Sequence, residues 1–392
     1  MKDLVIFWFR RDLRLHNNHG LFNALKSGKQ VLPIFIFDPE ILGKLPNKDT
    51  RVKFIHDELT KMNNQLRKKN SSIYIVHDKP KDALEKLTSV YEIKEVYTNH
   101  DYEPYATKRD QEINNFLNSK GIKFKTFKDQ VIFETNEVVK ADGTPYVVYT
   151  PYSRKWLEKF KLEGIQNYPS ENYLDNFVKK EHPSLSLKDI GFENPETHVS
   201  NYTVNNDLID DYEATRNYPA QGKTSRLGPH LRFGTISVRE IVLKASKRSN
   251  PTFLKELIWR EFFMQILWHF PHTHKDSFKS KYDRIPWRNN EEEFKKWCEG
   301  KTGYPLVDAG MRQLNQTGFM HNRVRMLVGS FLCKHLLIDW RWGEAYFAEK
   351  LHDYEMASNV GNWQWVAGSG VDAAPYFRIF NPTSQIQKFD KQ

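Results

Sequence analysis

The residues best suited to chemistry lie in the second half of the chain. The segment GKTSRLGPHLRFG (222–234) places Thr224, Ser225 and Arg226 just before a helical pattern. Two hydroxyls, free backbone N–H groups and a guanidinium can hold a phosphate at a helix N-terminus. An ordinary helix cap beside a surface arginine fits the same residues. The segment is not a P-loop, because its G-K-[ST] ending lacks the first glycine at the required spacing.

Two further stretches pair polar groups with stacking or polarisable side chains at helical spacing. ELIWREFF (256–263) places Glu256 and Trp259 one turn apart, so a carboxylate that can accept from base N–H groups lies beside a flat ring. GFMHNRVRM (318–326) places Asn322 and Met326 one turn apart, and an amide with a thioether suits the edge of an aromatic ligand. Core packing with solvated polar ends would produce the same spacings.

The C-terminal part also gathers the tryptophans. Eight of the ten lie from Trp259 onward, and Trp363 and Trp365 stand among small residues in NVGNWQWVAGSG (359–370). Such rings can fill a core, or they can carry electrons and stack on bases. Asp353, shortly before them, could hold the polar edge of a ring or pair with Arg325. Together these residues suggest an aromatic cofactor that is anionic at one end.

The elements that must position these residues follow from two different periodicities. In the first third of the chain, apolar runs at 3–9, 31–38, 71–78 and 95–100 alternate with helix-like segments such as 51–68 and 81–91. This βαβα rhythm predicts an α/β fold with a doubly wound, parallel, Rossmann-like sheet. No G-x-G-x-x-G follows the first run, so the dinucleotide fingerprint is missing. The later segments repeat apolar residues every three or four positions, which predicts helices.

The domain boundaries follow from these changes of pattern. We expect an α/β domain at 1–130, an interdomain connection at 131–203 and a helical domain at 204–392. The stretch from about 169 to 203 is rich in proline, serine, asparagine and charged residues, with little periodicity.

The composition sets limits on the class of protein. The chain has 392 residues, 39% hydrophobic and 14% aromatic, which is typical of a folded globular protein. Its formal net charge of +10 suits an anionic partner such as nucleic acid. Two cysteines cannot form a disulfide framework, a Cys₄ zinc site or an iron–sulfur cluster, and no metal is expected. The absence of a signal peptide or membrane span in the sequence predicts a cytoplasmic protein.

These motifs, taken in order, resemble those of the photolyase/cryptochrome family over nearly the whole chain. The matching stretches are WFRRDLRLHNN, TSRLG, ELIWREF, KTGYPLVDAGMRQL, GFMHNRVRM, LLIDWR, GNWQW and DAAPYFRIFNPTSQ. The sequence is most similar to class I cyclobutane pyrimidine dimer (CPD) photolyases. The resemblance implies a monomeric, light-dependent DNA repair enzyme that binds DNA containing such dimers and splits them by electron transfer from excited, reduced FAD to the flipped-out lesion.

The resemblance also implies a role for particular residues. Arg325 would pair with Asp353, Tyr354 would contribute backbone, and Asn359 would face the flavin N5. The implied FAD-binding residues are Tyr212, Thr224, Ser225, Arg226, Leu227, Gly228, Arg325, Asp353, Tyr354, Glu355 and Asn359. The implied electron chain runs inward through Trp287, Trp340 and Trp363, and the implied catalytic set adds Asn359 and Glu256. The implied DNA- and lesion-binding residues are Arg216, Glu256, Trp259, Arg260, Asn322, Arg323, Met326 and Trp365.

Some positions depart from the family pattern. Gly228 stands where relatives often carry a hydroxyl, and Phe253 replaces a more usual tryptophan near the flavin. Family members continue into further helices that contact DNA, so we expect a shortened C-terminal end. At the site of a second, antenna chromophore, folate-binding relatives carry Asn-Glu where this chain has Tyr105 and Ala106. DYEPYATKRD (101–110) resembles the deazaflavin type more closely. These residues do not identify the chromophore, and an empty or flavin-filled site is an alternative.

Three alternative functions remain at this stage. A cryptochrome-type blue-light photoreceptor shares the fold, but its usual long C-terminal extension is absent from this sequence. A (6-4) photolyase would show His-His where this chain has His321 and Asn322. A basic DNA-binding protein without flavin would explain the charge alone.

Overall fold

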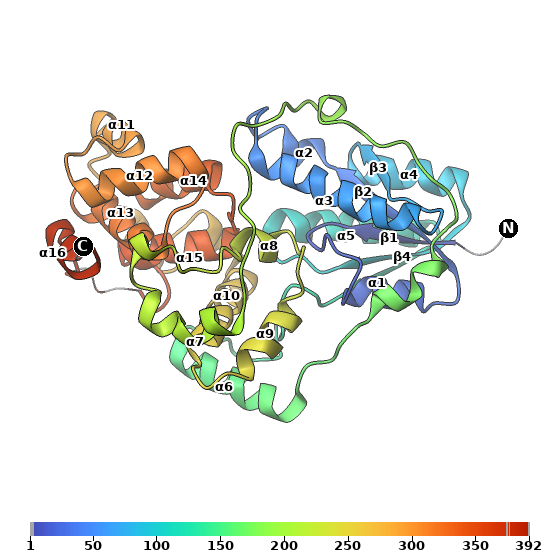
Figure 1. Cartoon of the computed structure of the whole chain (residues 1–392), viewed down its shortest axis with the longest axis horizontal. Coiled ribbons are helices and arrows are strands. Elements are labelled where there is room, and N and C mark those ends of the chain that lie inside the picture. The colour runs from blue at the N-terminus through green and yellow to red at the C-terminus, as the bar shows by residue number, and fades with distance from the viewer. Residues whose placement is uncertain (1–3, 374, 376, 391–392) are drawn as a thin grey trace. The chain divides into compact units, whose positions relative to one another are not determined.

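The computed structural model describes residues 4–373, 375 and 377–390, which form two compact units (Figure 1). The sheet unit comprises residues 1–132, 165–199 and 230–241, and the helical unit comprises 133–164, 200–229 and 242–392. The predicted connection at 131–203 is therefore divided, because 133–164 belong to the helical unit and 165–199 to the sheet unit.

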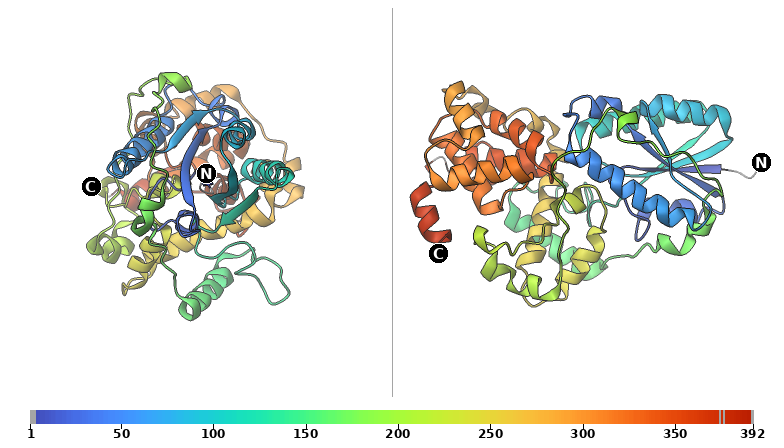
Figure 2. Two further views of the ribbon diagram at one scale, coloured as in Figure 1. Left: turned by 90° about the vertical axis from the view of Figure 1, so that its right-hand side faces the viewer. Right: turned by 45° about the horizontal axis from the view of Figure 1, so that its top comes forward.

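The sheet unit contains five parallel strands in the order β3-β2-β1-β4-β5, which confirms the predicted doubly wound sheet (Figures 1 and 2). The strands are β1 (Leu4–Phe9), β2 (Gln30–Phe37), β3 (Tyr74–His77), β4 (Ile93–Asn99) and β5 (Lys123–Phe127). The helices between them are α1 (His19–Leu25), α2 (Pro39–Leu42), α3 (Thr50–Arg67), α4 (Pro80–Val90) and α5 (Pro104–Ser119). Short 3₁₀ helices follow later, at Ser170–Asn176 and Lys188–Ile190.

Both faces of the sheet are buried, as the continuous apolar run of β1 requires. Alternate residues of a strand point to opposite faces. Val5, Phe7 and Phe9 accordingly pack in one core with residues of α1 and α3, whereas Ile6 and Trp8 pack in the other with residues of α4 and α5.

The strand β5 was missed by the sequence analysis. Lys123 and Lys125 interrupt its apolar residues, and its side chains are exposed or half-buried because it is an edge strand. After β5, no further strand occurs among the described residues, in agreement with the helical pattern in the sequence.

The helical unit is organised around α10 (Thr252–His269), which is buried on most of its surface and packs against α6, α7 and α15. The first helices of this unit are α6 (Tyr149–Glu163), α7 (Asn206–Thr215), α8 (Gly228–Arg232) and α9 (Val238–Ser246), of which α8 and α9 extend into residues 230–241 of the sheet unit. The later ones are α11 (Glu291–Glu299), α12 (Pro305–Thr317), α13 (Asn322–Lys334), α14 (Trp340–Lys350), α15 (Met356–Ala367) and α16 (Pro382–Phe389).

Helices α13, α14 and α15 pack on one another and bring several predicted residues together. Asn322 and Arg325 come from α13, and Asn359 and Trp363 from α15. Gly343 of α14 allows this close packing, because a Cβ atom at that position would lie 2.2 Å from the Trp363 ring. The glycine is therefore needed for the indole to reach its buried position.

Candidate functional site

The loop before α8 borders a cavity of about 220 Å³ in the helical unit. Thr224, Ser225 and Arg226 all line this cavity, so two hydroxyls and a guanidinium converge on one space. Arg226 has a φ of +54°, a left-handed conformation that is uncommon for a residue with a side chain. Its guanidinium carbon lies 3.3 Å from the centre of the Phe319 ring, which fixes the charge at the cavity. Other predicted residues that line it are Tyr212, Leu227, Gly228, Arg325 and Asp353.

The ion pair between Arg325 and Asp353, which the sequence suggested, is present. The Arg325 guanidinium donates to the two carboxylate oxygens of Asp353 at 2.9 and 3.1 Å, and its Nε donates to the Met320 carbonyl at 2.8 Å. Gly228 makes room for this carboxylate, because a Cβ atom there would lie 2.7 Å from the Asp353 Cβ. The glycine that departs from the family pattern thus has a steric reason in this chain.

A second cavity, of about 90 Å³, also borders this ion pair. Arg325, Asp353 and Asn322 line both cavities, so the ion pair belongs to the wall that the two cavities share. Predicted residues that line only the second cavity are Met326, Tyr354, Glu355, Asn359, Trp363 and Trp365. An elongated ligand with a phosphate at one end and a ring at the other would match this arrangement.

Asn359 lies inside a helix and not at its start. Helix α15 begins at Met356 after the cap residue Glu355, so Asn359 is not a helix cap. The Asn359 side chain donates to Glu344 of α14. Burial raises the pKa of the Glu344 carboxyl, while hydrogen bonds from Asn359 and Tyr354 lower it, and the net shift is upward.

The imidazole of His321 is buried at the start of α13, near three arginines. Its Nδ1 accepts from the Arg323 backbone N–H at 3.1 Å and caps the helix. Burial, together with the charges of Arg323, Arg325 and Arg226, lowers the pKa of His321 to about 4. The imidazole is therefore neutral at physiological pH, in surroundings that favour an anion.

Glu256 and Trp259 lie one turn apart on α10, as their spacing predicts. Glu256 accepts from the guanidinium of Arg216 at 2.5 Å. Trp259 stacks on Tyr149 with ring centres 3.6 Å apart and planes at 5°. Tyr149 was missed by the sequence analysis, because it lies in a stretch without a recognised motif.

The remaining residues expected to contact DNA have partners within the protein. Asn322 and Met326 share one face of α13, with the amide nitrogen 4.0 Å from the sulfur. Arg323 donates to Asn217 and covers the Phe389 ring. Arg260 is mostly buried, with a guanidinium nitrogen 3.5 Å from a carboxylate oxygen of Glu355.

The tryptophans expected to carry electrons occupy one core of the helical unit. Trp340 and Trp363 are buried, and Trp287 packs against the same core while half-buried. The Trp363 ring lies 6.1 Å from the fully buried ring of Trp297 and 5.0 Å from Phe347. Trp297 is thus a further indole beside Trp363 that no motif had singled out.

In the sheet unit, the segment 101–110 brings aromatic and charged groups to the carboxyl ends of β1 and β4. The Tyr105 hydroxyl donates to Asp38. The guanidinium carbons of Arg10 and Arg109 lie 5.1 and 5.0 Å from the Trp8 ring centre. Tyr105 and Arg109 belong to the segment that the resemblance associates with an antenna chromophore.

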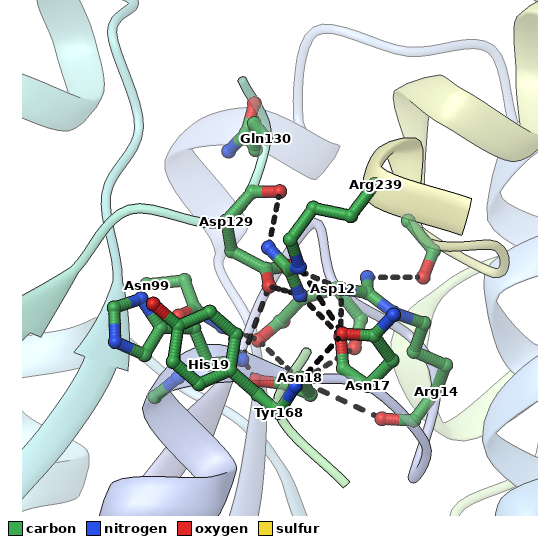
Figure 3. Close-up of polar contacts among 12 residues, drawn as sticks. Asp12, Arg14, Asn17, Asn18, His19, Asn99, Asp129, Gln130, Tyr168 and Arg239 are labelled. Carbon is green, nitrogen blue, oxygen red and sulfur yellow. Dashed lines mark hydrogen bonds and ion pairs between the residues drawn. The ribbon is translucent and has the colours of Figure 1, made fainter. Parts of the chain in front are cut away.

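A buried polar cluster fills another part of the same sheet edge (Figure 3). Asp129 accepts from the guanidiniums of Arg14 and Arg239 at 2.6 and 2.8 Å. Asp12, just after β1, accepts from Asn99 at the end of β4 at 2.6 Å. None of these contacts was predicted from the sequence, where WFRRDLRLHNN indicated only the family.

Two kinds of site find no support in the part of the chain that the structure describes. No group of three or more His, Cys, Asp or Glu side chains there is placed to hold a metal ion. Among the same residues, every helix is too short or too polar to cross a membrane.

Comparison with known proteins connects these features to one family. A family model described as DNA photolyase matches residues 5–171, and one described as the FAD binding domain of DNA photolyase matches residues 253–392. A deoxyribodipyrimidine photo-lyase of Halobacterium salinarum is 36% identical over 419 residues, which cover 99% of this chain and 87% of that protein.

Solved structures show the same likeness. An archaeal photolyase from Sulfolobus tokodaii with two FAD molecules is 35% identical, with a TM-score of 0.85 over 99% of this chain and 88% of that one. A bacterial class III photolyase from Agrobacterium tumefaciens is 35% identical, with a TM-score of 0.86 over 100% of this chain and 85% of that one.

Proposed function

This chain belongs to the DNA photolyase family, and we propose that it is a light-dependent repair enzyme that splits cyclobutane pyrimidine dimers in DNA. Its C-terminal part carries the family's FAD-binding domain. We propose that it is a class I enzyme, on the resemblance of its ordered motifs. Asn322 follows His321 where a (6-4) photolyase would carry a second histidine, which supports the preference for cyclobutane dimers.

The observation that carries the proposal is the pair of cavities that share Arg325 and Asp353. The chemistry of their lining fits FAD. Thr224, Ser225 and Arg226 can bind a pyrophosphate at one end, and Asn359 can hydrogen-bond a polar ring edge at the other. Because Gly228 packs closely against Asp353, the backbone of the loop before α8 lies beside a residue that lines both cavities.

The residues of this chain would bind and orient the lesion beside that cofactor. Trp259, held flat by Tyr149, offers a stacking surface, and Trp365 lines the smaller cavity. Glu256 can accept from base N–H groups, with Arg216 fixing its carboxylate. A flipped base loses its stacking in the duplex, and such aromatic surfaces replace part of that loss. FAD bound in its reduced form would supply the electron that splits the dimer and take it back afterwards.

Light-driven repair of a defined substrate tests this function. Purified protein should show flavin absorbance and, under blue light, convert a thymine dimer in single- or double-stranded DNA to two thymines, with no conversion in the dark. Bound flavin without repair would indicate a photoreceptor, and (6-4) photoproduct repair alone would indicate the other repair specificity. DNA binding without flavin would indicate the plain DNA-binding protein.

Trp287, Trp340 and Trp363 are proposed to carry electrons to the flavin. Replacing Trp363 with Phe should then abolish photoreduction of oxidised flavin and spare repair after chemical reduction. Trp342, a half-buried indole on the edge of the same core, provides the matched Trp342→Phe control. Unchanged photoreduction in Trp363→Phe would remove Trp363 from the route.

For the second chromophore, we propose a deazaflavin-type molecule in the sheet unit. The Tyr105–Ala106 pair in place of Asn-Glu supports this assignment over folate. Mass spectrometry of the small molecules released from the purified protein would decide it, and a folate would contradict it.

A further inference from the structure

Two N–H groups of α13 are directed at the sulfur of Met326. The Arg323 Nη1 lies 3.7 Å from the Met326 Sδ, and the Asn322 Nδ2 lies 4.0 Å from it. A thioether sulfur is a weak hydrogen-bond acceptor, so these contacts contribute little in the ordinary state of the side chain. They nevertheless place a cation and an amide beside any oxygen atom that becomes bonded to this sulfur.

The Arg323 guanidinium has the capacity to bind a further acceptor. Its Nη2 donates to Asn217, and the Phe389 ring lies 4.4 Å from its central carbon. Its charge has no carboxylate partner among the residues that the structure describes, and its Nε is buried without a hydrogen-bond partner among them. A strong acceptor on Met326 would therefore hold Arg323 more tightly than the thioether does.

Met326 also differs from most other methionines in its access to solvent. Met326 is half-buried and lines the 90 Å³ cavity, so a small oxidant can reach it. Met356 is half-buried too, but it lies outside the lining of this cavity, and its sulfur has no hydrogen-bond donor in the described part of the chain. The other methionines that the structure describes are at most 4% exposed: Met62, Met264, Met311 and Met320.

We propose that Met326 is a site of reversible oxidation by peroxides, and that its sulfoxide oxygen accepts hydrogen bonds from Arg323 and Asn322 and withdraws both from DNA. The sulfur attacks one oxygen of hydrogen peroxide, the O–O bond breaks, and the departing hydroxide takes the proton from the new S–OH group. The sulfur thus loses two electrons, and the peroxide is reduced to water. Enzymatic reduction of the sulfoxide restores the thioether. The effect on DNA rests on the proposed function, in which Arg323 and Asn322 bind the damaged strand.

DNA binding before and after mild treatment with hydrogen peroxide tests this switch. The affinity of the parent for dimer-containing DNA should fall about tenfold, the effect of one hydrogen bond to a charged group, and should recover after treatment with methionine sulfoxide reductases. Met326→Leu should keep its own starting affinity, whereas the matched control Met356→Leu should lose as much as the parent. The loss should be smaller in Arg323→Ala. A loss in Met326→Leu equal to that of the parent would overturn the inference.

Two measurements without DNA distinguish failure of this inference from failure of the proposed function. By peptide mass spectrometry, Met326 should be oxidised roughly tenfold faster than the buried methionines, and equal rates would overturn the inference. In protein labelled with ¹⁵N-asparagine, the Asn322 side-chain signal is identified by its loss in Asn322→Ser. Peroxide should shift this signal in the parent and leave it in place in Met326→Leu. An unchanged signal in the oxidised parent would contradict the inference, whereas absence of DNA binding before treatment would contradict the proposed function.

Discussion

Arginine–aspartate pairs occur in two regions of this protein with opposite surroundings. In the sheet unit, Asp129 lies between Arg14 and Arg239, and all three side chains are buried (Figure 3). In the helical unit, the side chains of Arg325 and Asp353 are 24% and 19% exposed and border two cavities. The chemical groups are the same, but only the second pair has open space beside it.

The difference shows how a polar cluster can be assigned to structure or to binding. Asp129 also accepts from the His19 backbone N–H, so its hydrogen-bonding capacity is used by the protein itself. Open α/β sheets usually bind ligands where the strand order reverses, which here lies between β1 and β4. Asp12, Asn18 and Asn99 occupy part of that position with mutual hydrogen bonds. The polar groups of the buried cluster are therefore used within the protein, whereas those that line the cavities of the helical unit are open to a ligand.

Removing Asp129 should produce the largest effect on stability. Asp129→Ala leaves two buried guanidiniums without their carboxylate, and such a change typically costs about 3–5 kcal/mol. Urea unfolding followed by circular dichroism should show this loss.

Asp175→Ala is the matched control in the same unit, because Asp175 forms an exposed ion pair with Lys69. Its loss should be within about 1 kcal/mol. If the two variants unfold alike, the cluster around Asp129 does not stabilise the sheet unit.

Both regions contain a pair of stacked rings, but only the pair in the helical unit is proposed to bind DNA. Trp259 stacks on Tyr149 in the helical unit, and His19 stacks on Tyr168 in the buried cluster. Trp259→Ala should weaken binding to dimer-containing DNA by about 1–3 kcal/mol, the usual loss for one stacked base. Binding to undamaged DNA should change little, because it depends mostly on phosphate charge.

Fluorescence anisotropy with both DNAs measures this selectivity, and Tyr168→Ala should leave it unchanged. Equal losses on the two DNAs would make Trp259 a packing residue.

Much of the sheet unit could be predicted from the sequence because its signal is local. β1 to β4 are short apolar runs bounded by turn residues, and their alternation with helices implies a parallel sheet. The buried cluster could not be predicted in this way. Arg14 and Arg239 lie 115 and 110 residues from Asp129 in the chain. A charged residue considered with its sequence neighbours alone is predicted to lie on the surface.

The candidate site shows the same limit. Arg325, Asp353 and the TSRLG loop were identified because they lie in recognisable motifs. Glu344, Trp297 and Tyr149 were not, because their roles depend on which helix packs beside them. The steric need for glycine at 228 also appears only when Asp353 is seen against it.

The pH dependence of the free energy of unfolding should show the titration of Asp129. Burial alone would raise the pKa of Asp129, but the charges of Arg14 and Arg239 outweigh burial and lower it from 3.8 to about 2. A depressed pKa adds stability above the unfolded value and loses it as the pH falls toward the folded value. The difference in unfolding free energy between the parent and Asp129→Ala should therefore shrink by about 2 kcal/mol between pH 4 and pH 2.

The contribution of Asp12 to stability changes with pH in the opposite direction. Burial, reinforced by the charge of Asp129, raises its pKa, so the folded protein gains stability as the pH falls through that raised value. Introducing Asp12→Asn into both the parent and Asp129→Ala should remove this contribution and leave the Asp129 transition visible. A difference between the two proteins that is constant from pH 4 to pH 2 would contradict the assignment.

The smallest expected effect on stability is that of breaking the open pair. In Arg325→Met, the Asp353 carboxylate stays hydrated by the cavities, so no charge is left buried without a partner. Partly exposed pairs contribute little, and the free energy of unfolding of the flavin-free chain should fall by less than about 1 kcal/mol. Flavin retention should fall instead, because Arg325 and Asp353 border both parts of the proposed site. Urea unfolding of the flavin-free protein, together with flavin absorbance of the purified variant, measures both quantities. A stability loss as large as that of Asp129→Ala, with flavin retained, would show that the open pair is structural as well.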